Sequence, residues 1–479
     1  MYGLKNKLIK KQLVIYSAII IFLSVMCFTY FDILYILPVV LCMMFFMFFT
    51  LSISGTAIYK IRDLTKKVKK DYLLVIPFYI GCLSFRIRDV NAIEENPLDI
   101  ASLIRVIMWM IPIIVCLLYI IKSNKLVLEG FKGIIFMMTI YALYALISSF
   151  YSVIPTLSFY RSVELLVVII VVSYVINKIQ NLDELKIFLN LNYLILTCLI
   201  FITWLIFPVY PNLVSFGFGD GGGTKFQLGG VFIHPNALGT IATIVFIISF
   251  FRTLRTKILS EKYMYVWMTL FSFITLFSTV SRTNLLIAVG VTIIALMVSK
   301  YYKILIMMFN LSVITILIIP FIREKLIDFF MRGQDLSLLF SLSERLPIWN
   351  AAIQVSQNKP ILGHGFVSSR IIMPEAYRVA HFAPTSAHNS FLDVLVNLGY
   401  MGMILIIIVF FYMWILLLKN YKKLKCINIE LLAIVFCVSI AAMTGVSFGG
   451  QIDHKFLITI IAIVVLHKAN LLLKDYKLA

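Results

Sequence analysis

The residue best suited to proton transfer in this sequence is His388, in segment 384–393 (PTSAHNSFLD). Ser390, followed three residues later by Asp393, has the form of a helix N-cap box, which places His388 just before the first turn of a helix. The positive end of a helix disfavours imidazolium, and a neutral imidazole can accept a proton from a hydroxyl group. We interpret His388 as a general base supported by Asn389 and Asp393. A capping or headgroup-contacting histidine is the alternative.

Arginine side chains offer a second kind of chemistry, because a flat, weakly hydrated guanidinium fork matches the oxygens of a phosphate group. Arg161 and Arg282 lie at the ends of predicted helices, and Arg345 lies in a long polar segment. Several arginines of this kind near one long loop suggest phosphate chemistry. An arginine at a helix rim can instead reach lipid headgroups as an anchor, and Arg345 can pair with Glu344 or cap its own helix.

The other histidines and the cysteines give weaker signals. The seven cysteines are an odd number, in apolar segments or at their edges, and they predict no disulfide framework. No cluster with metal-ligand spacing and no Asp-x-Asp motif occurs in the sequence, so we predict a mechanism without a metal ion or cofactor. Four histidines lie in loops containing glycine or proline, where we expect a solvated ring: His234, His364, His381 and His454.

The elements that would position these residues are membrane spans. With 62% hydrophobic residues, 13% charged residues and a mean hydropathy of +1.01, the chain cannot be a water-soluble globule with a polar surface. We predict an all-α polytopic membrane protein with about 12–14 transmembrane helices. Fourteen candidate spans start near residues 13, 33, 72, 103, 133, 163, 187, 236, 263, 284, 304, 390, 430 and 456, the third being the weakest.

Lysine and arginine fall on opposite sides of this arrangement. Of the 42 basic residues, 28 lie on the side that holds the N-terminus, and 25 of these are lysines. The positive-inside rule therefore predicts that both termini are cytoplasmic. These lysines account for most of the net charge of +20, so no nucleic-acid partner is implied. Nine of the thirteen basic residues on the outer side are arginines: Arg86, Arg88, Arg161, Arg282, Arg323, Arg332, Arg345, Arg370 and Arg378.

The connections between spans divide the chain into regions, because most are short and one outer segment is long. In that long segment a predicted helix at 343–357 is followed by breaks at Pro360, Gly363 and Gly365, which indicates a small lid-like domain. The regions are N-terminal spans 1–130, membrane core 131–322, large outer loop 323–389 and C-terminal spans 390–479. The shorter outer loops of the core are 151–162, 208–235 and 278–284.

Five motifs follow one another in the second half of the chain. They are FIHPNALG at 232–239, TVSRTN at 279–284, RLPIWN at 345–350, PILGHG at 360–365 and HNSFLDVLVNLGYMG at 388–402. Their order and spacing resemble those of the O-antigen ligase and polymerase superfamily, over roughly residues 130–450. The N-terminal spans add nothing diagnostic to this resemblance.

The resemblance implies about twelve helices around an outer-face cavity that a large loop covers. It implies a membrane glycosyltransferase that uses a polyprenyl-diphosphate-linked glycan donor, a glycan acceptor and no metal. His388 corresponds to the catalytic histidine of the motif, and Arg161, Arg282 and Arg345 correspond to arginines that hold the diphosphate. The supporting residues are Asn236, Asn389 and Asp393. A single displacement would invert the anomeric carbon.

Several functions remain open at this stage. Polymerase and ligase differ in the acceptor. We favour a capsule or exopolysaccharide polymerase, because a composition rich in lysine, isoleucine and phenylalanine is compatible with a bacterium that lacks an outer membrane. A flippase for lipid-linked oligosaccharide is the competing class, although repeated halves are not evident. A third possible function is that of a structural anchor for a glycan assembly complex. The expected location is the bacterial cytoplasmic membrane, with the active site outside and with a flippase and a chain-length regulator of the pathway as candidate partners.

Overall fold

The computed structural model describes most of the chain from residue 56 onward. The first two predicted spans, near residues 13 and 33, lie outside the described residues, as do Glu344 and His381. The described residues are 56–83, 100–123, 133–217, 226–318, 345–378, 383–424, 427–450 and 452–475, without 233 and 447, together with 320, 323, 324 and 327.

The described residues are mainly helical, as the sequence predicts. Long apolar segments fold as helices because all backbone polar groups are then paired within the segment, as membrane lipid requires. The weak third span corresponds to the short helices η1 (Lys70–Val75) and α4 (Ile76–Gly81), which follow α3 (Thr56–Lys67). The helices that match later spans are α6 (Ile100–Ser123), α7 (Ile134–Ile147), α8 (Pro155–Asn177), α9 (Leu182–Ile206), α11 (Pro235–Arg255), α12 (Leu259–Ser278), α13 (Arg282–Val298), α14 (Tyr302–Ile318), α19 (Ser390–Asn420), α20 (Asn428–Thr444) and α21 (His454–Asp475).

Six helices in the described ranges are long and apolar enough to cross a membrane, namely α6, α8, α9, α11, α19 and α21. Four further apolar helices, within α7, α13, α14 and α20, are shorter. The predicted all-α, multi-pass membrane protein is confirmed in this general form. The total number of spans and the side on which each terminus lies stay predictions.

The chain forms two compact units. Helices α9 and α13 each contribute residues to both units. Unit 1 consists of Met1–Arg62, Cys198–Leu285 and Lys300–Gly333, and unit 2 consists of Asp63–Thr197, Leu286–Ser299 and Gln334–Ala479.

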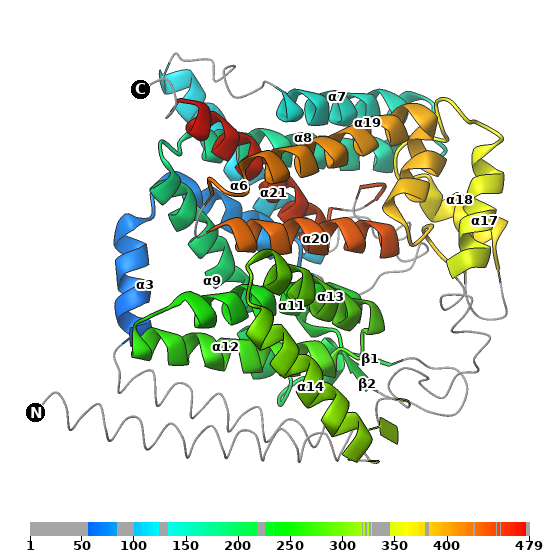
Figure 1. The fold of residues 1–479 in the computed structure, drawn as a ribbon. Helices are drawn as coiled ribbons and strands as arrows, with labels where there is room; N and C mark the ends of the chain where they lie inside the picture. The colour runs from blue at the N-terminus through cyan, green and yellow to red at the C-terminus, as the bar shows by residue number, and fades with distance from the viewer. Residues whose placement is uncertain are drawn as a thin grey trace, which may run out of the picture. The chain divides into compact units, whose positions relative to one another are not determined.

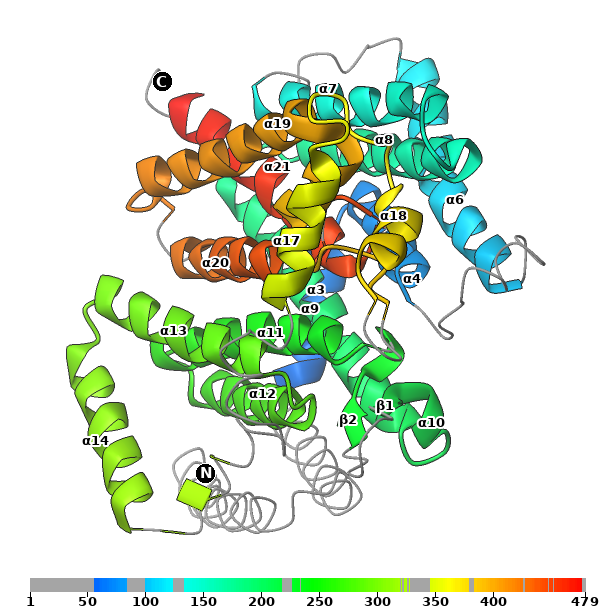
Figure 2. The same ribbon diagram turned by 90° about the vertical axis from the view of Figure 1, so that its right-hand side faces the viewer.

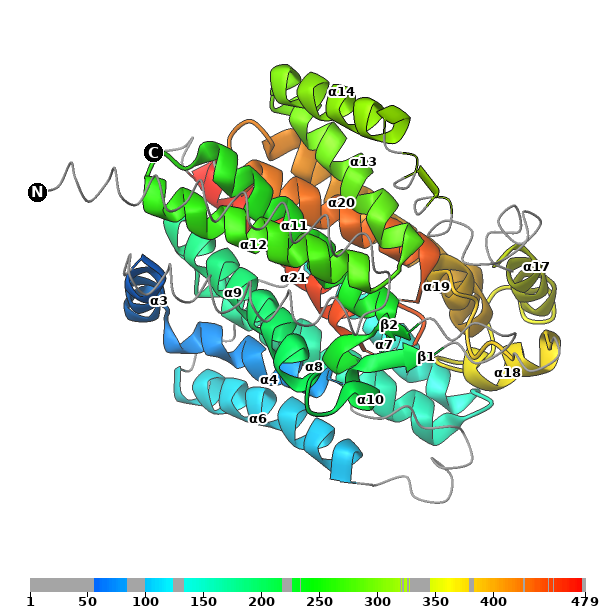
Figure 3. The same cartoon turned by 90° about the horizontal axis from the view of Figure 1, so that it is seen from below.

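Unit 1 is built on the packing of α11 against α12 (Figure 3). The indole N–H of Trp204, in α9, donates to Thr275 Oγ1 in α12 at 2.9 Å. The connection predicted as a plain loop at 208–235 contains structure. Its elements are α10 (Pro211–Val214), the antiparallel pair of β1 (Ser215–Gly217) and β2 (Phe226–Leu228), and η4 (Gly230–Phe232).

Unit 2 has α8 and α21 in its interior. In their apolar stretches 67% and 78% of the residues are buried, whereas α6 has 17% buried. Helix α7 packs on α8 and α19, and α20 packs on α19 and α21 (Figure 1). The exposed face of α6 is apolar, with Leu103, Ile107 and Met110 about half exposed. Such a face suits contact with lipid rather than water.

Helix α19 is divided at Gly399, whose φ of 64° and ψ of −166° are not helical. The part after Gly399 is long enough, at about 1.5 Å per residue, to cross a hydrocarbon core of about 30 Å. The part before Gly399 packs against α17 (Arg345–Ser356) and α18 (Ser369–Ala376) (Figure 2). The predicted helix at 343–357 is therefore confirmed at 345–356, and α17 and α18 lie beside the entry to α19.

The first residues of α6, α8, α19 and α21 lie at one end of unit 2. Arg105 Nη2, in α6, donates to the carbonyl of Ile452 just before α21 at 2.6 Å. The Ser158 hydroxyl, in α8, donates to the carbonyl of Phe366 before α18. Asn397 Nδ2, in α19, donates to the carbonyl of Gly449 at 2.6 Å. The polar side chains of unit 2 that could do chemistry gather at this end.

Candidate functional site

His388 lies two residues before α19, and its backbone is in the left-handed region with φ 49°. Asn389 caps the helix, because its Oδ1 accepts from the backbone N–H groups of the first turn, including that of Phe391 at 3.0 Å. The predicted Ser390 cap is wrong. Ser390 is already helical, and its hydroxyl donates to the Gly445 carbonyl at 2.8 Å. The prediction that His388 directly precedes the first turn is confirmed.

A buried carboxylate holds the peptide before His388. Asp393 is fully buried, and its Oδ1 accepts the backbone N–H of Ala387 at 3.0 Å. Its Oδ2 accepts from Asn397 Nδ2 at 3.3 Å. A Cβ on Gly449 would collide with the same carboxylate, so this close approach requires glycine. Asp393 thus anchors the turn that keeps His388 in its unusual conformation.

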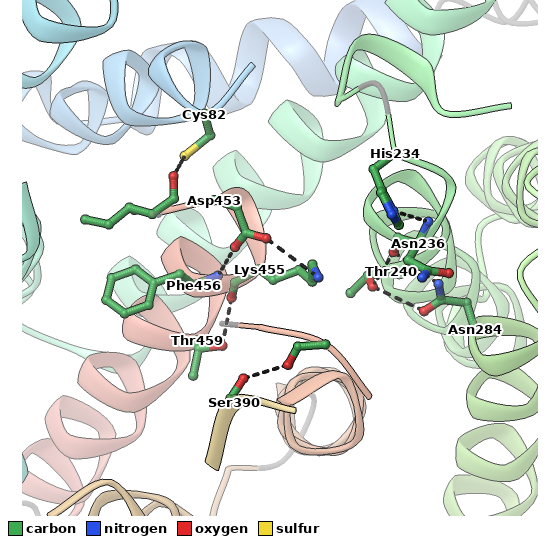
Figure 4. A network of polar contacts seen from close by, with 12 residues as sticks. Cys82, His234, Asn236, Thr240, Asn284, Ser390, Asp453, Lys455, Phe456 and Thr459 are labelled. Atoms are coloured by element: carbon green, nitrogen blue, oxygen red, sulfur yellow. Dashed lines mark hydrogen bonds and ion pairs between the residues drawn. The ribbon is translucent and has the colours of Figure 1, made fainter. Parts of the chain in front are cut away.

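Two cations lie near enough to His388 to change its protonation. Burial lowers the pKa of His388 to about 4, and the positive charges of Arg345 and Lys455 act in the same direction. Arg345 begins α17, and burial lowers its own pKa as well. Lys455 Nζ lies 3.7 Å from Asp453 Oδ2 at the start of α21 (Figure 4). We call His388, Arg345 and Lys455 the histidine centre. At physiological pH its imidazole is neutral.

The segment before α18 fixes α17 and α18 against α19. The backbone N–H of His364 donates to the Val396 carbonyl at 3.1 Å, and that of Gly365 donates to the Asn397 carbonyl at 2.8 Å. Gly363 has φ 71°, and a Cβ there would collide with the Asn397 carbonyl. The predicted break after the loop helix is confirmed, and it serves to dock the loop on the divided helix.

Arg161 lies inside α8 rather than in a loop. The predicted outer loop 151–162 is wrong from Pro155 onward, because this proline begins the helix, a position that proline favours. Arg161 Nη1 lies 2.6 Å from Glu164 Oε2, and Arg105 Nε lies 3.3 Å from Glu164 Oε1. The Nε of Arg161 is buried and has no hydrogen-bond partner among the described residues. One buried carboxylate therefore faces two guanidinium groups.

A third arginine joins this pair. Arg370 is the second residue of α18, and burial together with the charges of Arg161 and Arg105 lowers its pKa to about 10. Direct contacts hold α18 beside α8: the Ser158 hydroxyl donates to the Phe366 carbonyl. We call the set of Arg105, Arg161, Arg370 and Glu164 the guanidinium cluster.

Unit 1 contains a separate polar network at the first turns of α11 and α13. Arg282 begins α13, and the hydroxyl of Ser281 before it donates to Asn236 Oδ1 at 2.7 Å. Asn284 Nδ2 donates to the Asn236 carbonyl at 3.1 Å. His234 caps α11, because its Nδ1 accepts the Asn236 N–H at 3.2 Å (Figure 4). The network fixes the backbone on which Arg282 stands.

The structure groups the predicted site residues within each of the two units. Within unit 2 it brings His388 and Arg345 together and places Arg161 in the guanidinium cluster. Arg282 and Asn236 lie together in unit 1. Three cations were not predicted as site residues: Lys455, Arg370 and Arg105. Arg105 could have been found from the sequence, because it is an ionisable residue inside an apolar run. Such residues usually pair with another polar group.

Two histidines that we expected in solvent are buried. His364 is 8% exposed and His454 is 2% exposed. The ring of His364 contacts the Val396 carbonyl through Nδ1 at 3.0 Å. Both residues stand in connections that fold back onto α19 or begin α21. A glycine or proline nearby therefore did not indicate a solvated loop.

Residues 267–407 match a family model described as O-Antigen ligase. The matched range contains Arg282, Arg345, His388, Asn389 and Asp393. It extends from α12 through α17 and α18 into α19, and so includes the loop that docks on the divided helix. Comparison with the curated proteins found none that matches the chain.

Proposed function

Because residues 267–407 match the O-Antigen ligase family model, we propose that this protein is a bacterial cell-surface polysaccharide polymerase. It transfers polyprenyl-diphosphate-linked glycan repeat units onto a sugar hydroxyl at the outer face of the cytoplasmic membrane. The transfer needs no metal ion and inverts the anomeric carbon. The family supports a membrane glycosyltransferase-like function of ligase or polymerase type, and the donor and acceptor are part of the proposal.

The observation that supports this chemistry best is the state of His388. Its pKa of about 4 leaves the imidazole neutral at physiological pH, and Asp393 holds the backbone N–H of Ala387, the residue before His388. A neutral, positioned imidazole is what removal of a hydroxyl proton requires. Arg345 and Lys455 supply positive charge at the same place for a leaving diphosphate.

In the proposed step the acceptor oxygen attacks the anomeric carbon of the donor. A new C–O bond forms as the bond between that carbon and the diphosphate oxygen breaks. The hydroxyl proton passes to the imidazole of His388, and the electron pair of the broken bond stays on the lipid diphosphate. Guanidinium groups stabilise that charge by paired hydrogen bonds.

Donor binding would also make His388 a better base. Without a bound donor, two cations disfavour the imidazolium. A bound diphosphate brings negative charge beside them and offsets their effect, so the pKa of His388 rises toward its ordinary value in the complex. The histidine then approaches the range in which general bases are most effective.

We assign the leaving diphosphate to Arg345, with Lys455 beside the base. Arg282, in unit 1, stays a further proposed phosphate ligand. Arg161 belongs to the same set of proposed phosphate ligands and acts within the guanidinium cluster. Asn236 supports Arg282 through the network before α13, and Asn389 and Asp393 support His388.

The proposed orientation has both termini in the cytoplasm and the histidine centre outside. The segregation of lysine and arginine supports it. So does the meeting of the first residues of α6, α8, α19 and α21 at one end of unit 2, since the predicted spans that match them all enter from the outer side. A flippase and a chain-length regulator of the same pathway are the proposed protein partners.

The test is transfer by the purified full-length protein with lipid-diphosphate-linked repeat units in EDTA, with products separated on a gel. We expect a ladder of polymer from the wild type and none from His388→Asn. Asparagine tolerates the left-handed backbone of position 388, so this variant removes the base with little change to the fold.

Other outcomes identify other functions. Transfer that occurs once a different glycolipid or wall acceptor is supplied would show a ligase. Transport of the lipid-linked glycan across vesicles without transfer to any acceptor would show a flippase. A full ladder from His388→Asn would exclude His388 as the base.

A further inference from the structure

The guanidinium cluster has more positive than negative charge. Arg105 and Arg161 share the single carboxylate of Glu164, at 3.3 and 2.6 Å. Arg370 adds a third guanidinium, and among the described residues its side chain forms no hydrogen bond or ion pair. Asp453, the next nearby acid, lies 3.7 Å from Lys455. Desolvated guanidinium groups in excess of their counter-ions are costly unless an anion completes the set.

The contacts of α8 explain why Arg370 meets Arg161. Ser158 and Arg161 are three residues apart and lie on one face of the helix. The Ser158 hydroxyl donates to the Phe366 carbonyl. Ser368, two residues before Arg370, lies with its hydroxyl 3.0 Å from that of Ser152. Arg370 therefore projects from a backbone that is tied to the helix bearing Arg161.

The cluster is distinct from the histidine centre but adjacent to it. The cations that act on Arg370 are Arg161 and Arg105, whereas those that act on His388 are Arg345 and Lys455. One short segment joins the two: the Ile452 carbonyl accepts from Arg105 at 2.6 Å, and Lys455 follows three residues later. Three residues span at most about 11 Å. The backbone carbonyl that Arg105 contacts therefore lies close in the chain to the residue that carries the ammonium group of the histidine centre.

The helices that carry the guanidinium cluster expose apolar side chains near it in the chain. On α8, Phe159 is 55% exposed, in the turn before Arg161. On α6, Leu103 and Ile104 are 51% and 47% exposed, directly before Arg105. A free anion in water would gain nothing from these neighbours. A phosphate group attached to a lipid would place its chain against them.

We propose that the guanidinium cluster is a second binding site, which holds the diphosphate of a lipid-linked acceptor beside the donor at the histidine centre. This assignment rests on the proposed function, because a polymerase handles two lipid-linked substrates and a ligase need not. Arg161 and Arg370 are the residues that the cluster contributes to the ligand, while Glu164 keeps Arg105 and Arg161 in place. The acceptor is then bound by its lipid end, and its sugar reaches His388.

Binding of farnesyl diphosphate to the purified full-length protein in phosphatidylcholine nanodiscs tests the second site. We expect two molecules per chain in the wild type and one in Arg370→Gln, with affinity at the lost site lowered about ten- to a hundredfold, as for one charge-assisted interaction. The matched control is Arg378→Gln, because Arg378 is an exposed arginine two residues after α18. It should bind as the wild type does. Equal stoichiometry and affinity in Arg370→Gln would overturn the proposal.

The source of the phosphate group is tested by competition. Phosphatidylglycerol nanodiscs that abolish the Arg370-dependent binding of farnesyl diphosphate would show a phospholipid site and overturn the acceptor assignment. Retained binding in those nanodiscs supports it. Inorganic pyrophosphate that binds as tightly as farnesyl diphosphate would also overturn the assignment, because the lipid chain would then contribute nothing.

Kinetics separate this proposal from the proposed function. With donor saturating, Arg370→Gln should raise KM for a lipid-linked acceptor about ten- to a hundredfold and leave kcat and the donor KM near the wild-type values. The same variant should use a lipid-free acceptor glycan as poorly as the wild type does. An unchanged acceptor KM would refute the second site even where polymer forms. The binding experiment gives its answer even if no transfer is found.

Discussion

The histidine centre and the guanidinium cluster lie at the same end of unit 2. Both contain basic side chains, but the positive charges act on different partners. In the histidine centre the cations face an uncharged ring and lower its pKa to about 4. In the guanidinium cluster they face a buried carboxylate, which two of them share. The difference lies in the partner. Beside the imidazole of His388, positive charge keeps the ring unprotonated. Beside the carboxylate of Glu164, three guanidinium groups leave a net positive charge, which suits an anion.

The largest expected effect is loss of the base. His388→Asn should lower kcat about 10²- to 10⁴-fold, the usual contribution of general acid–base catalysis. His388→Gly, which also accepts a positive φ, is the matched variant and should lose as much. Thermal unfolding in detergent should stay near that of the wild type for both. If either variant keeps activity within tenfold of the wild type, His388 is not the base. The histidine centre would then not differ from the guanidinium cluster in containing one.

The next effect belongs to the guanidinium cluster and is one of stability. Glu164→Gln leaves buried guanidinium groups without their acid, and loss of one partner of a buried ion pair costs about 3–5 kcal/mol. We expect a lower midpoint of thermal unfolding. Glu184→Gln is the control, because Glu184 pairs with Lys69 in a more exposed position and should change the midpoint less. Equal midpoints for wild type and Glu164→Gln would contradict the structure of the cluster.

A smaller effect should follow from Asp393→Ala. It leaves the backbone N–H of Ala387 without an acceptor in a buried place, which costs about 1–3 kcal/mol. Because the turn before His388 is then less well held, kcat should also fall. Asp393→Asn keeps an oxygen that can accept the same hydrogen bond and should recover part of kcat. If both variants retain wild-type kcat, Asp393 does not position the base.

The smallest effect is a displacement of the pH profile. Arg345 disfavours the imidazolium, so Arg345→Gln should raise the pKa of His388 above about 4. A raised pKa means that the base is protonated at higher pH, and the acid limb of kcat/KM moves upward. The value at neutral pH should fall about tenfold through weaker diphosphate binding. Arg345→Lys should leave the acid limb in place. An unmoved limb in Arg345→Gln would show that Arg345 does not act on the base.

The helices could be predicted from the sequence because lipid requires long apolar runs. The predicted starts near 133, 236 and 390 agree with Ile134, Pro235 and Ser390. The position of His388 before a helix could also be predicted from the spacing of Ser390 and Asp393, which is typical of a helix N-terminus. In these cases a local pattern determines local structure.

The details of the site could not be predicted, because they depend on residues far apart in the chain. Glu164 is three residues from Arg161, but nothing local shows that Arg105 joins them from another helix. The helix cap was predicted at Ser390 but is formed by Asn389, since both side chains suit a cap and the contact of Ser390 with Gly445 is a tertiary one.

The docking of the loop on α19 has a consequence for biosynthesis. The loop residue Phe366 accepts from Ser158, which is synthesised earlier, whereas His364 donates to Val396, which is synthesised later. Asn397 in turn needs Gly449, and Lys455 follows near the end of the chain. A ribosome-bound chain can therefore have most of its helices in the membrane and still lack a formed catalytic site. The proposed transfer should begin only when the last helix is released, so that a nascent chain does not act on the proposed donor.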